Sequence, residues 1–259
     1  MTDIDEAMDW QGNELHCADC LNRVLASAGR CRLLHACVED RYAKRIDRFF
    51  EWNHKLAVEY LAHPYFEVRA VAAKHVDVFH LPRLINDPDE TVRWSAAQRL
   101  PSRHLLLMRT DPDREVRIRV ASRLEECHLG SMMKDMDYYV RQVVARRLPA
   151  GMLILMMHDP DPEVRLTVAR RIGDEWLVKM SCDKDARVRI EVVGRINAQL
   201  LSPLLNDPDW RVRYEVASRI PEQHLAQMSA DDDPAVRKLV ASRLAQGNNG
   251  NGLRILSAV

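Results

Sequence analysis

The sequence lacks the features that would place a protein in a membrane or outside the cell. Its longest apolar run, at residues 152–157, is far too short to cross a bilayer. Residues 1–10 are acidic and show no basic start followed by an apolar stretch, so we expect no signal peptide. We therefore predict a cytoplasmic protein with no membrane segment. In that compartment, cysteines serve as ligands or buried thiols more often than as disulfides.

An excess of charge of one sign is also missing. Lys and Arg together number 38, as do Asp and Glu, so the chain is not of the strongly basic type that binds nucleic acids. Hydrophobic residues make up 47% and charged residues 29%, which is typical of a folded protein. No nucleophile–base pair, phosphate loop or pair of catalytic carboxylates is recognisable, and we predict that the protein is not an enzyme.

A Val-Arg pair recurs every 24 residues over most of the chain. The eight pairs follow one another without insertion, which indicates stacked supersecondary units instead of an ordinary domain. The arginines of these pairs are Arg69, Arg93, Arg117, Arg141, Arg165, Arg189, Arg213 and Arg237.

Most copies begin with two aspartates that are separated by one residue, as in Asp87-Pro88-Asp89. We expect the first aspartate to cap a helix and the proline to take the first helical position. The helix of this copy should end near Leu100, just before a second proline. Residues 102–108 then carry apolar side chains three apart, which predicts a tight turn or 3₁₀ segment and no second full helix.

The arginine of each pair falls on the core face of its helix. On a helical wheel, Val92, Ala96, Ala97 and Leu100 cover one arc, and Arg93 lies inside it. Because a bare buried charge is costly, these arginines should form a ladder of bonds to the turn aspartates and to free carbonyls. Arg99 and its equivalents lie at the edge of the arc and are expected to bind carbonyls at the joints between copies.

Four of the six cysteines lie close together, at a spacing of C-x2-C-x10-C-x5-C: Cys17, Cys20, Cys31 and Cys37. Four thiols in a reducing compartment point to a bound metal, and both zinc and an iron–sulfur cluster accept four thiolates. Arg30 and Arg32 flank Cys31, and their charge would stabilise a negative cluster. The residues alone leave the cluster and zinc equally open, with disulfides as a lesser alternative.

The other candidate ligands stand apart from this set. Cys127 and Cys182 are single, and we expect both to be inert thiols. His80, His104, His128 and His224 share one register of the repeat. Packed helices stand ~8–10 Å apart, so histidines from different copies are too distant to share an ion, and these should be rim residues.

These patterns divide the chain into three parts and predict an all-α fold. Residues 1–62 should hold the metal domain and capping helices, residues 63–246 the eight copies, and residues 247–259 a flexible Gly/Asn link with a terminal cap. Arg45 lies 24 residues before Arg69, but Lys44 takes the valine position, which indicates a degenerate half-repeat.

The residues resemble the leucine-rich variant (LRV) repeat of bacteria. Asp-Pro-Asp, Val-Arg and Ala-x-Arg-Leu at this period match it over nearly the whole chain, and His63 in place of the first turn aspartate is a mild departure. The resemblance implies a right-handed superhelical solenoid of alternating α and 3₁₀ helices. It also implies that Cys17, Cys20, Cys31 and Cys37 hold a [4Fe–4S] cluster, which favours the cluster over zinc.

The resemblance also carries an expectation about function. Such proteins are met in nitrogen-fixing bacteria, which suggests a scaffold that binds a protein partner and uses its cluster for electron transfer or redox sensing. The alternative is a nucleic-acid-binding repeat protein with a structural metal centre. The balanced charge disfavours nucleic acid as the partner.

Overall fold

The computed structural model of the chain describes residues 6–255. Their regular structure is helical, and the β-type pairings among them are two isolated bridges, Met8–Glu14 and Arg32–Ala36. The protein is therefore all-α, as the periodicity predicts. It forms two compact units, Met1–Met132 and Met133–Val259. This division falls inside the predicted repeat array, and the domain limits predicted from the sequence stay predictions.

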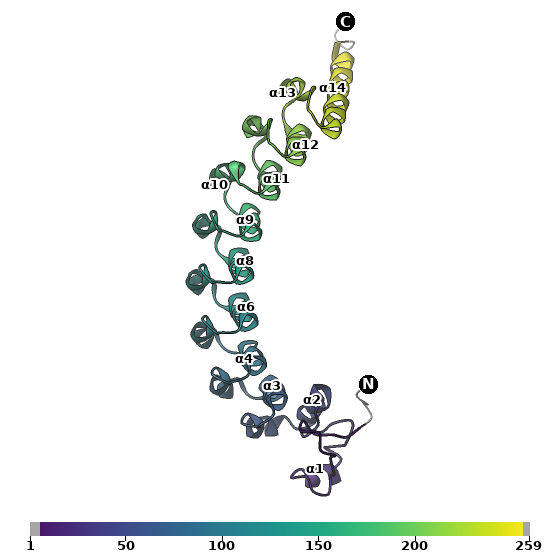
Figure 1. Cartoon of the computed structure of the whole chain (residues 1–259), viewed down its shortest axis with the longest axis vertical. Helices are drawn as coiled ribbons and strands as arrows, with labels where there is room; N and C mark the ends of the chain where they lie inside the picture. The colour runs from purple at the N-terminus through teal and green to yellow at the C-terminus, as the bar shows by residue number, and fades with distance from the viewer. Residues whose placement is uncertain (1–5, 256–259) are drawn as a thin grey trace. The chain divides into compact units, whose positions relative to one another are not determined.

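The first unit contains the cysteine-rich segment and the first three copies of the repeat. Helices α1 (Arg23–Ser27), α2 (Ala43–Trp52) and η1 (His54–Tyr60) precede the repeats. Helix α2 packs against α3, and α3 against α4 (Figure 1). The elements of the copies are α3 (Phe66–His75), η2 (Val78–Leu84), α4 (Glu90–Ala97), α5 (Ser102–Leu105), η3 (Leu106–Met108), α6 (Arg114–Arg123), α7 (Glu126–Leu129) and η4 (Gly130–Met132).

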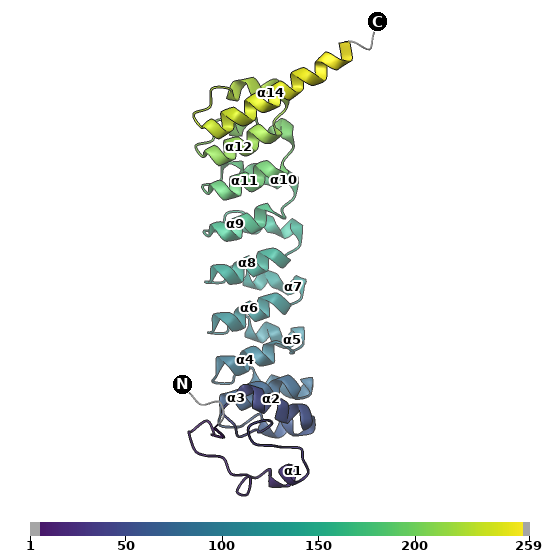
Figure 2. The same ribbon diagram turned by 90° about the vertical axis from the view of Figure 1, so that its right-hand side faces the viewer.

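The second unit contains five further long helices, each carrying one Val-Arg pair. Neighbouring long helices pack against one another in chain order, as Figure 2 shows for α8, α9, α11 and α12. Its elements are α8 (Tyr138–Arg147), η5 (Ala150–Met156), α9 (Pro162–Ala169), α10 (Asp174–Leu177), η6 (Val178–Cys182), α11 (Ala186–Arg195), η7 (Ala198–Leu200), η8 (Ser202–Leu204), α12 (Trp210–Arg219), α13 (Glu222–Leu225), η9 (Ala226–Met228) and α14 (Pro234–Ile255).

Within each unit the long helices form one layer and the short segments a second layer (Figure 1). The short segments follow the prediction closely: either a 3₁₀ run, as in η2, or one α turn continued by a 3₁₀ turn, as in α5 and η3. Helix α4 ends at Ala97, three residues before the predicted Leu100. Leu100 nevertheless reaches the core, because the chain stays in a tight turn after the helix.

The core lies between the two layers and is built from small and branched side chains. Val92, Ala96, Ala97 and Leu100 are all fully buried, as the helical wheel predicts. Leu105 and Met108 of the short segment close the core from the other side, with 1% and 2% of their surface exposed. Small alanines on the long helices let neighbouring copies approach closely, which suits a repeat that must bury its face against the next copy.

The two aspartates of each turn divide their roles differently from the prediction. The second aspartate caps the helix: the Asp89 carboxylate accepts from the Thr91 amide at 2.9 Å, and α4 begins at Glu90. The expectation that the first aspartate caps and that Pro88 opens the helix was wrong. The Asp87 carboxylate instead accepts from the Asp89 amide at 2.9 Å and from Arg69, so its oxygens are engaged outside the helix.

Six arginines of the ladder each bind one carboxylate and one or two carbonyls. Arg93 donates through Nε and Nη2 to the two oxygens of Asp111, at 2.8 and 2.9 Å, and through Nη1 to the carbonyls of Asp87 and Pro88. The guanidinium thus joins its own turn to the next one, and it is only 8% exposed. The same fork joins these pairs: Arg69–Asp87, Arg141–Asp159, Arg165–Asp183, Arg189–Asp207 and Arg213–Asp231.

The remaining two members of the set also bind turn carbonyls. Arg117 donates to the carbonyls of Asp111 and Pro112, at 2.9 and 3.1 Å. Arg237 donates to those of Asp231 and Asp232. Eighteen residues after Arg237 the sequence has Ile255 instead of an aspartate, so the regular spacing of carboxylate partners ends there.

The edge arginines cap the preceding long helix. Arg99 donates through Nη1 to the carbonyls of Ala73 and Val76, at 2.9 and 2.7 Å, at the end of α3. A cation at a helix C-terminus also complements the helix dipole. The same kind of bond to a preceding copy is made by Arg123, Arg171, Arg195, Arg219 and Arg243.

The C-terminal segment differs from the predicted flexible link, because α14 continues as a helix to Ile255. Glycine weakens a helix by about 1 kcal/mol relative to alanine but adopts helical angles, and extending an existing helix costs far less than starting one. The predicted cap reaches residue 256, which lies outside the described residues. None of the helices within residues 6–255 combines the length and hydropathy of a bilayer-spanning segment.

Candidate metal centre

All four cysteines of the predicted set line one cavity of about 360 Å³ in the first unit: Cys17, Cys20, Cys31 and Cys37. Cys31 and Cys37 are buried, with 7% and 3% of their surface exposed, and the other two are half-buried. None of the four forms a disulfide. The structure thus brings together the residues that the sequence spacing selects.

Tight turns before α1 position the first pair of cysteines. The Cys20 amide donates to the Cys17 carbonyl at 3.4 Å, which turns both side chains toward the cavity. The Asn22 amide donates to the Cys20 sulfur at 3.3 Å, and its side-chain nitrogen donates to the Tyr60 hydroxyl at 2.8 Å. Asn22 therefore links the sulfur to Tyr60 in the helical part of the unit, and a hydrogen bond from an amide to sulfur stabilises a thiolate.

A hairpin-like turn positions the second pair. The backbones of Arg32 and Ala36 pair in an antiparallel bridge, and Leu34 at its tip has a φ of 59°, the left-handed region that a leucine rarely adopts. Such a sharp turn brings Cys31 and Cys37 to the same side of the chain. Backbone strain of this kind is held only where surrounding contacts fix it, and it concentrates at functional sites.

A buried ion pair holds the end of this turn against α2. The Cys37 amide donates to the Arg45 carbonyl at 3.1 Å. The Arg45 guanidinium donates to the Asp40 carboxylate at 2.9 Å, and Asp40 is fully buried. Arg45 is the degenerate copy of the ladder arginine, and its carboxylate comes from its own turn instead of the next. The half-repeat thereby supports the cysteine loop.

The two buried thiols are hydrogen-bonded to one another. This bond and burial raise the pKa of the Cys37 thiol, while the same bond lowers the pKa of Cys31. Burial also raises the pKa of Cys20, and the Asn22 amide partly offsets it. A bound metal would displace these thiol protons, because a metal ligates the thiolate.

The charged residues around the cavity differ from those expected. Arg30 and Arg32 are exposed, and the Arg30 guanidinium donates to the Trp52 carbonyl at 3.3 Å. Neither lines the cavity, because successive residues of an extended segment point to opposite sides and Cys31 takes the inward side. The charged residues that line it are acidic: Asp9, Glu14, Asp19 and Glu39.

The residues that sequence reasoning missed are those whose role depends on contacts across the unit. No regular spacing in the sequence points to Asn22 or Asp40. Asn22 acts through a hydrogen bond from its backbone amide to a sulfur, and Asp40 acts through its ion pair with a buried arginine. The acidic lining could have been noticed only for Asp19, which lies between the first two cysteines. His16, the residue before Cys17, also lines the cavity.

The four thiols line one cavity, but their sulfurs do not all meet at one point. Within residues 6–255, no three of them lie within 4.8 Å of one another. A single zinc ion at ~2.3 Å from each sulfur would require all four to be roughly 3.8 Å apart. The thiols would therefore have to draw together to hold one zinc ion, and a donor set of four thiolates suits either zinc or an iron–sulfur cluster.

Comparison with known proteins identifies the segment and the array. A family model described as the LRV protein FeS4 cluster matches residues 7–59, which include all four cysteines. An uncharacterized 27.7 kDa protein from the nifB 3′ region of Rhodobacter capsulatus is 49% identical over 104 residues. This match covers 40% of the chain and 42% of the relative's length.

A solved structure covers far more of the chain. It is described as a leucine-rich repeat variant with a novel repetitive protein structural motif. It is 42% identical, it aligns with 89% of this chain and 99% of its own, and the TM-score is 0.84.

Proposed function

The chain belongs to the leucine-rich repeat variant family and carries that family's iron–sulfur domain, and on this basis we propose that it is a non-catalytic scaffold with a redox-active [4Fe–4S] cluster. The ligands of the cluster are Cys17, Cys20, Cys31 and Cys37. The repeats bind a partner protein, and the cluster exchanges electrons with that partner or reports the redox state to it. The single observation that carries the proposal is the cavity lined by all four free thiols.

The arrangement of the thiols supports four-cysteine ligation of a cubic cluster. All four thiols line one cavity, and the family model that matches residues 7–59 is that of an iron–sulfur cluster. Four protein ligands leave no iron with an open position, so the cluster supplies electron transfer and does not bind a substrate. The acidic lining favours the oxidised state of the cluster over its reduced state, because nearby carboxylates repel the negative charge that reduction adds.

The state of the arginines supports a protein as the partner. Six of the ladder arginines each form a buried ion pair with one aspartate, so their charge is not available to phosphates. A salt-titrated binding assay on random DNA and RNA tests the alternative. We expect no affinity that falls with salt, and an affinity that does so would favour a nucleic-acid-binding protein instead.

The relative from Rhodobacter capsulatus supports a setting for this function. That protein is described by its place in the nifB 3′ region. We propose that the present chain likewise serves iron–sulfur chemistry connected with nitrogen fixation. A pull-down from the native host under anaerobic conditions, with oxidised and reduced protein, tests this. Capture of an iron–sulfur protein of nitrogen fixation in one redox state supports the link, and equal capture of unrelated proteins in both states opposes it.

The metal assignment is tested by analysis of protein purified without oxygen. We expect about four irons and four acid-labile sulfides per chain, a brown colour and reversible reduction by one electron. Cys37→Ser should lose most of the bound iron, whereas Cys182→Ser, an exposed cysteine of the second unit, should keep it. A colourless protein with one tightly bound zinc would show the cluster assignment to be wrong.

A further inference from the structure

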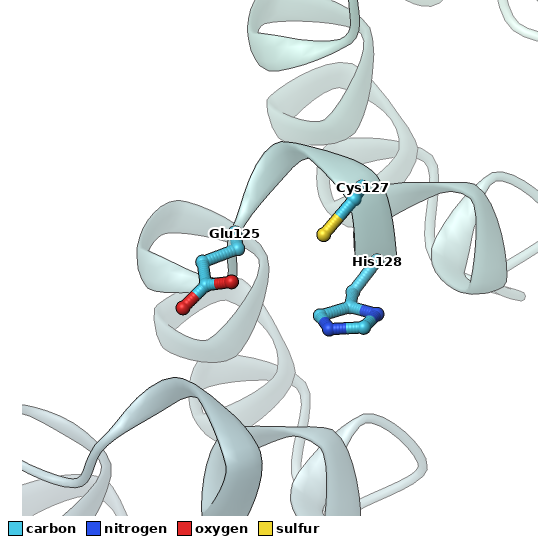
Figure 3. Close-up of side chains that lie close together, drawn as sticks. All are labelled: Glu125, Cys127 and His128. Atoms are coloured by element: carbon cyan, nitrogen blue, oxygen red, sulfur yellow. The ribbon is translucent and has the colours of Figure 1, made fainter.

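A second group of metal-ligating side chains lies outside the cysteine-rich segment. Glu125 immediately precedes α7, Cys127 and His128 lie on that helix, and Figure 3 shows the three side chains close together. One ligand atom of each residue lies within 4.8 Å of those of the other two. Within residues 6–255 this is the one such cluster of three or more.

The three donor groups have no other task among the described residues. The Glu125 carboxylate does not cap α7, although Glu125 is the residue before its first turn. Cys127 is a free, exposed thiol. The described structure gives none of the three side chains a hydrogen bond or ion pair, whereas His224, at the same register as His128, lies within hydrogen-bond distance of Gln223 and Gln227.

The repeat pattern does not account for these residues either. At the register of Glu125 the other copies have Asp77, Pro101, Pro149, Gly173, Asn197 and Pro221. At the register of Cys127 they have Phe79, Arg103, Gly151, Glu175, Gln199 and Gln223. At the register of His128 several other copies also have histidine. Asp77 and His80 also combine a carboxylate with a histidine, but only the copy with Glu125 and His128 adds a cysteine between them.

We propose that Glu125, Cys127 and His128 bind a divalent zinc-type cation. Carboxylate, thiolate and imidazole are the three side-chain ligands that zinc takes, and three protein ligands leave a fourth position for water. Donors at ~2.0–2.3 Å from zinc are roughly 3.3–3.8 Å apart. The side chains must therefore draw together by about 1 Å, which bond rotations of exposed side chains permit. On binding, the Cys127 thiol releases its proton to water.

This inference replaces the expectation that Cys127 is an inert thiol and His128 a rim residue. Histidines of different copies remain too far apart to share an ion, but these three ligands all come from one copy. Cys127 and Glu125, one and three residues before His128, supply the ligands that a second histidine could not.

Protection of Cys127 from alkylation tests the site in the full, cluster-loaded chain. Zinc ions are added to the anaerobic protein, and the rates of modification of Cys127 and Cys182 by N-ethylmaleimide are followed by peptide mass spectrometry. Cys182 is the control, since it is also exposed and free. At a zinc concentration ten times the dissociation constant, mass action leaves roughly one tenth of Cys127 unbound, so its modification should slow about tenfold.

Two variants separate a built site from an incidental effect of zinc on a thiol. Glu125→Gln and His128→Ala should each weaken the protection of Cys127 by about tenfold or more in zinc concentration, and a chelator should reverse it in the wild type. Both residues lie at the surface or near it, so the fold should be retained. Equal protection of Cys127 and Cys182, or protection that is unchanged in both variants, would overturn the proposal.

Discussion

At the residue scale, the ladder arginine is the most heavily bonded side chain of each copy. Arg141 donates to both oxygens of Asp159 and to the carbonyls of Asp135 and Met136, at distances of 2.8 to 3.2 Å. A guanidinium has five N–H donors in a planar fork, and four hydrogen bonds are donated here. The desolvation of both charges is offset only because nearly every donor and acceptor is paired.

Arg141→Met should therefore destabilise the second unit. The substitution keeps much of the side-chain volume but leaves the Asp159 carboxylate, 5% exposed, without its cation. We expect a loss of about 3 kcal/mol in the free energy of unfolding, measured by urea titration. Arg187→Met is the matched control, because Arg187 pairs with Glu163 and Asp185 at an exposed site. A change as small as that of the control would contradict the buried role.

Acid should weaken one rung of the ladder in a defined direction. The hydrogen bond from Arg213 lowers the pKa of Asp231 below its ordinary value of 3.8. The unfolded chain then binds more protons than the folded chain in this range, so the stabilisation is complete above about pH 4 and is lost as the pH falls through the lower folded value. Arg213→Met should thus cost less stability at pH 3 than at pH 6 in urea unfolding. An equal cost at both values would contradict this linkage.

At the element scale, the turn between copies depends on two aspartates with separate tasks. The first is held by the arginine fork, and the second caps the following helix. In the turn before α9, Asp159 binds Arg141 and Asp161 accepts from the Glu163 amide at 2.8 Å. This division explains why the spacing of the two aspartates is kept even where the residue between them is not proline.

Asp161→Ala should destabilise α9 without affecting the ladder. The loss of the cap leaves amides of the first turn without a partner, and the expected cost is about 1 kcal/mol in urea unfolding. Asp161→Asn is the control, since asparagine caps a helix about as well. An equal loss in both variants would show that the charge of Asp161, and not its cap bond, stabilises the turn.

At the scale of the whole molecule, the repeats and the metal centre depend on different sources of stability. Within each unit the long helices pack on their neighbours in the chain, so the repeats of a unit do not need distant contacts. The cysteine-rich segment has little regular structure and few buried apolar side chains before Ala36. A small segment of this kind gains its order from its bound metal.

Removal of the metal centre should therefore disorder the cysteine-rich segment and spare the repeats. After treatment with an oxidant and a chelator, we expect far-ultraviolet circular dichroism to keep most of its helical signal. Limited proteolysis should then cut within residues 6–36 far faster than in the loaded protein. Loss of most of the helical signal would contradict this, because it would show that the repeats require the cluster to fold.

The sequence determined the features that repeat or that depend on local spacing. The 24-residue period, the core face of Val92, Ala96 and Ala97, and an arginine inside that face all follow from helical geometry, which acts over a few residues. Likewise, four closely spaced cysteines in a reducing compartment indicate a bound metal, because disulfides are rare there. These signals are visible in the chain because each arises from neighbours in sequence.

Only the tertiary structure decided which partner each group takes. The Arg69 guanidinium pairs with Asp87, 18 residues away, although the sequence contains several aspartates that were equally possible partners. Arg30 and Arg32 turned away from the cavity that Glu39 lines, and Cys127 met Glu125 and His128. Side-chain direction and the packing of one element on another settle such pairings, because a charge or a thiol bonds to whatever the fold brings within reach.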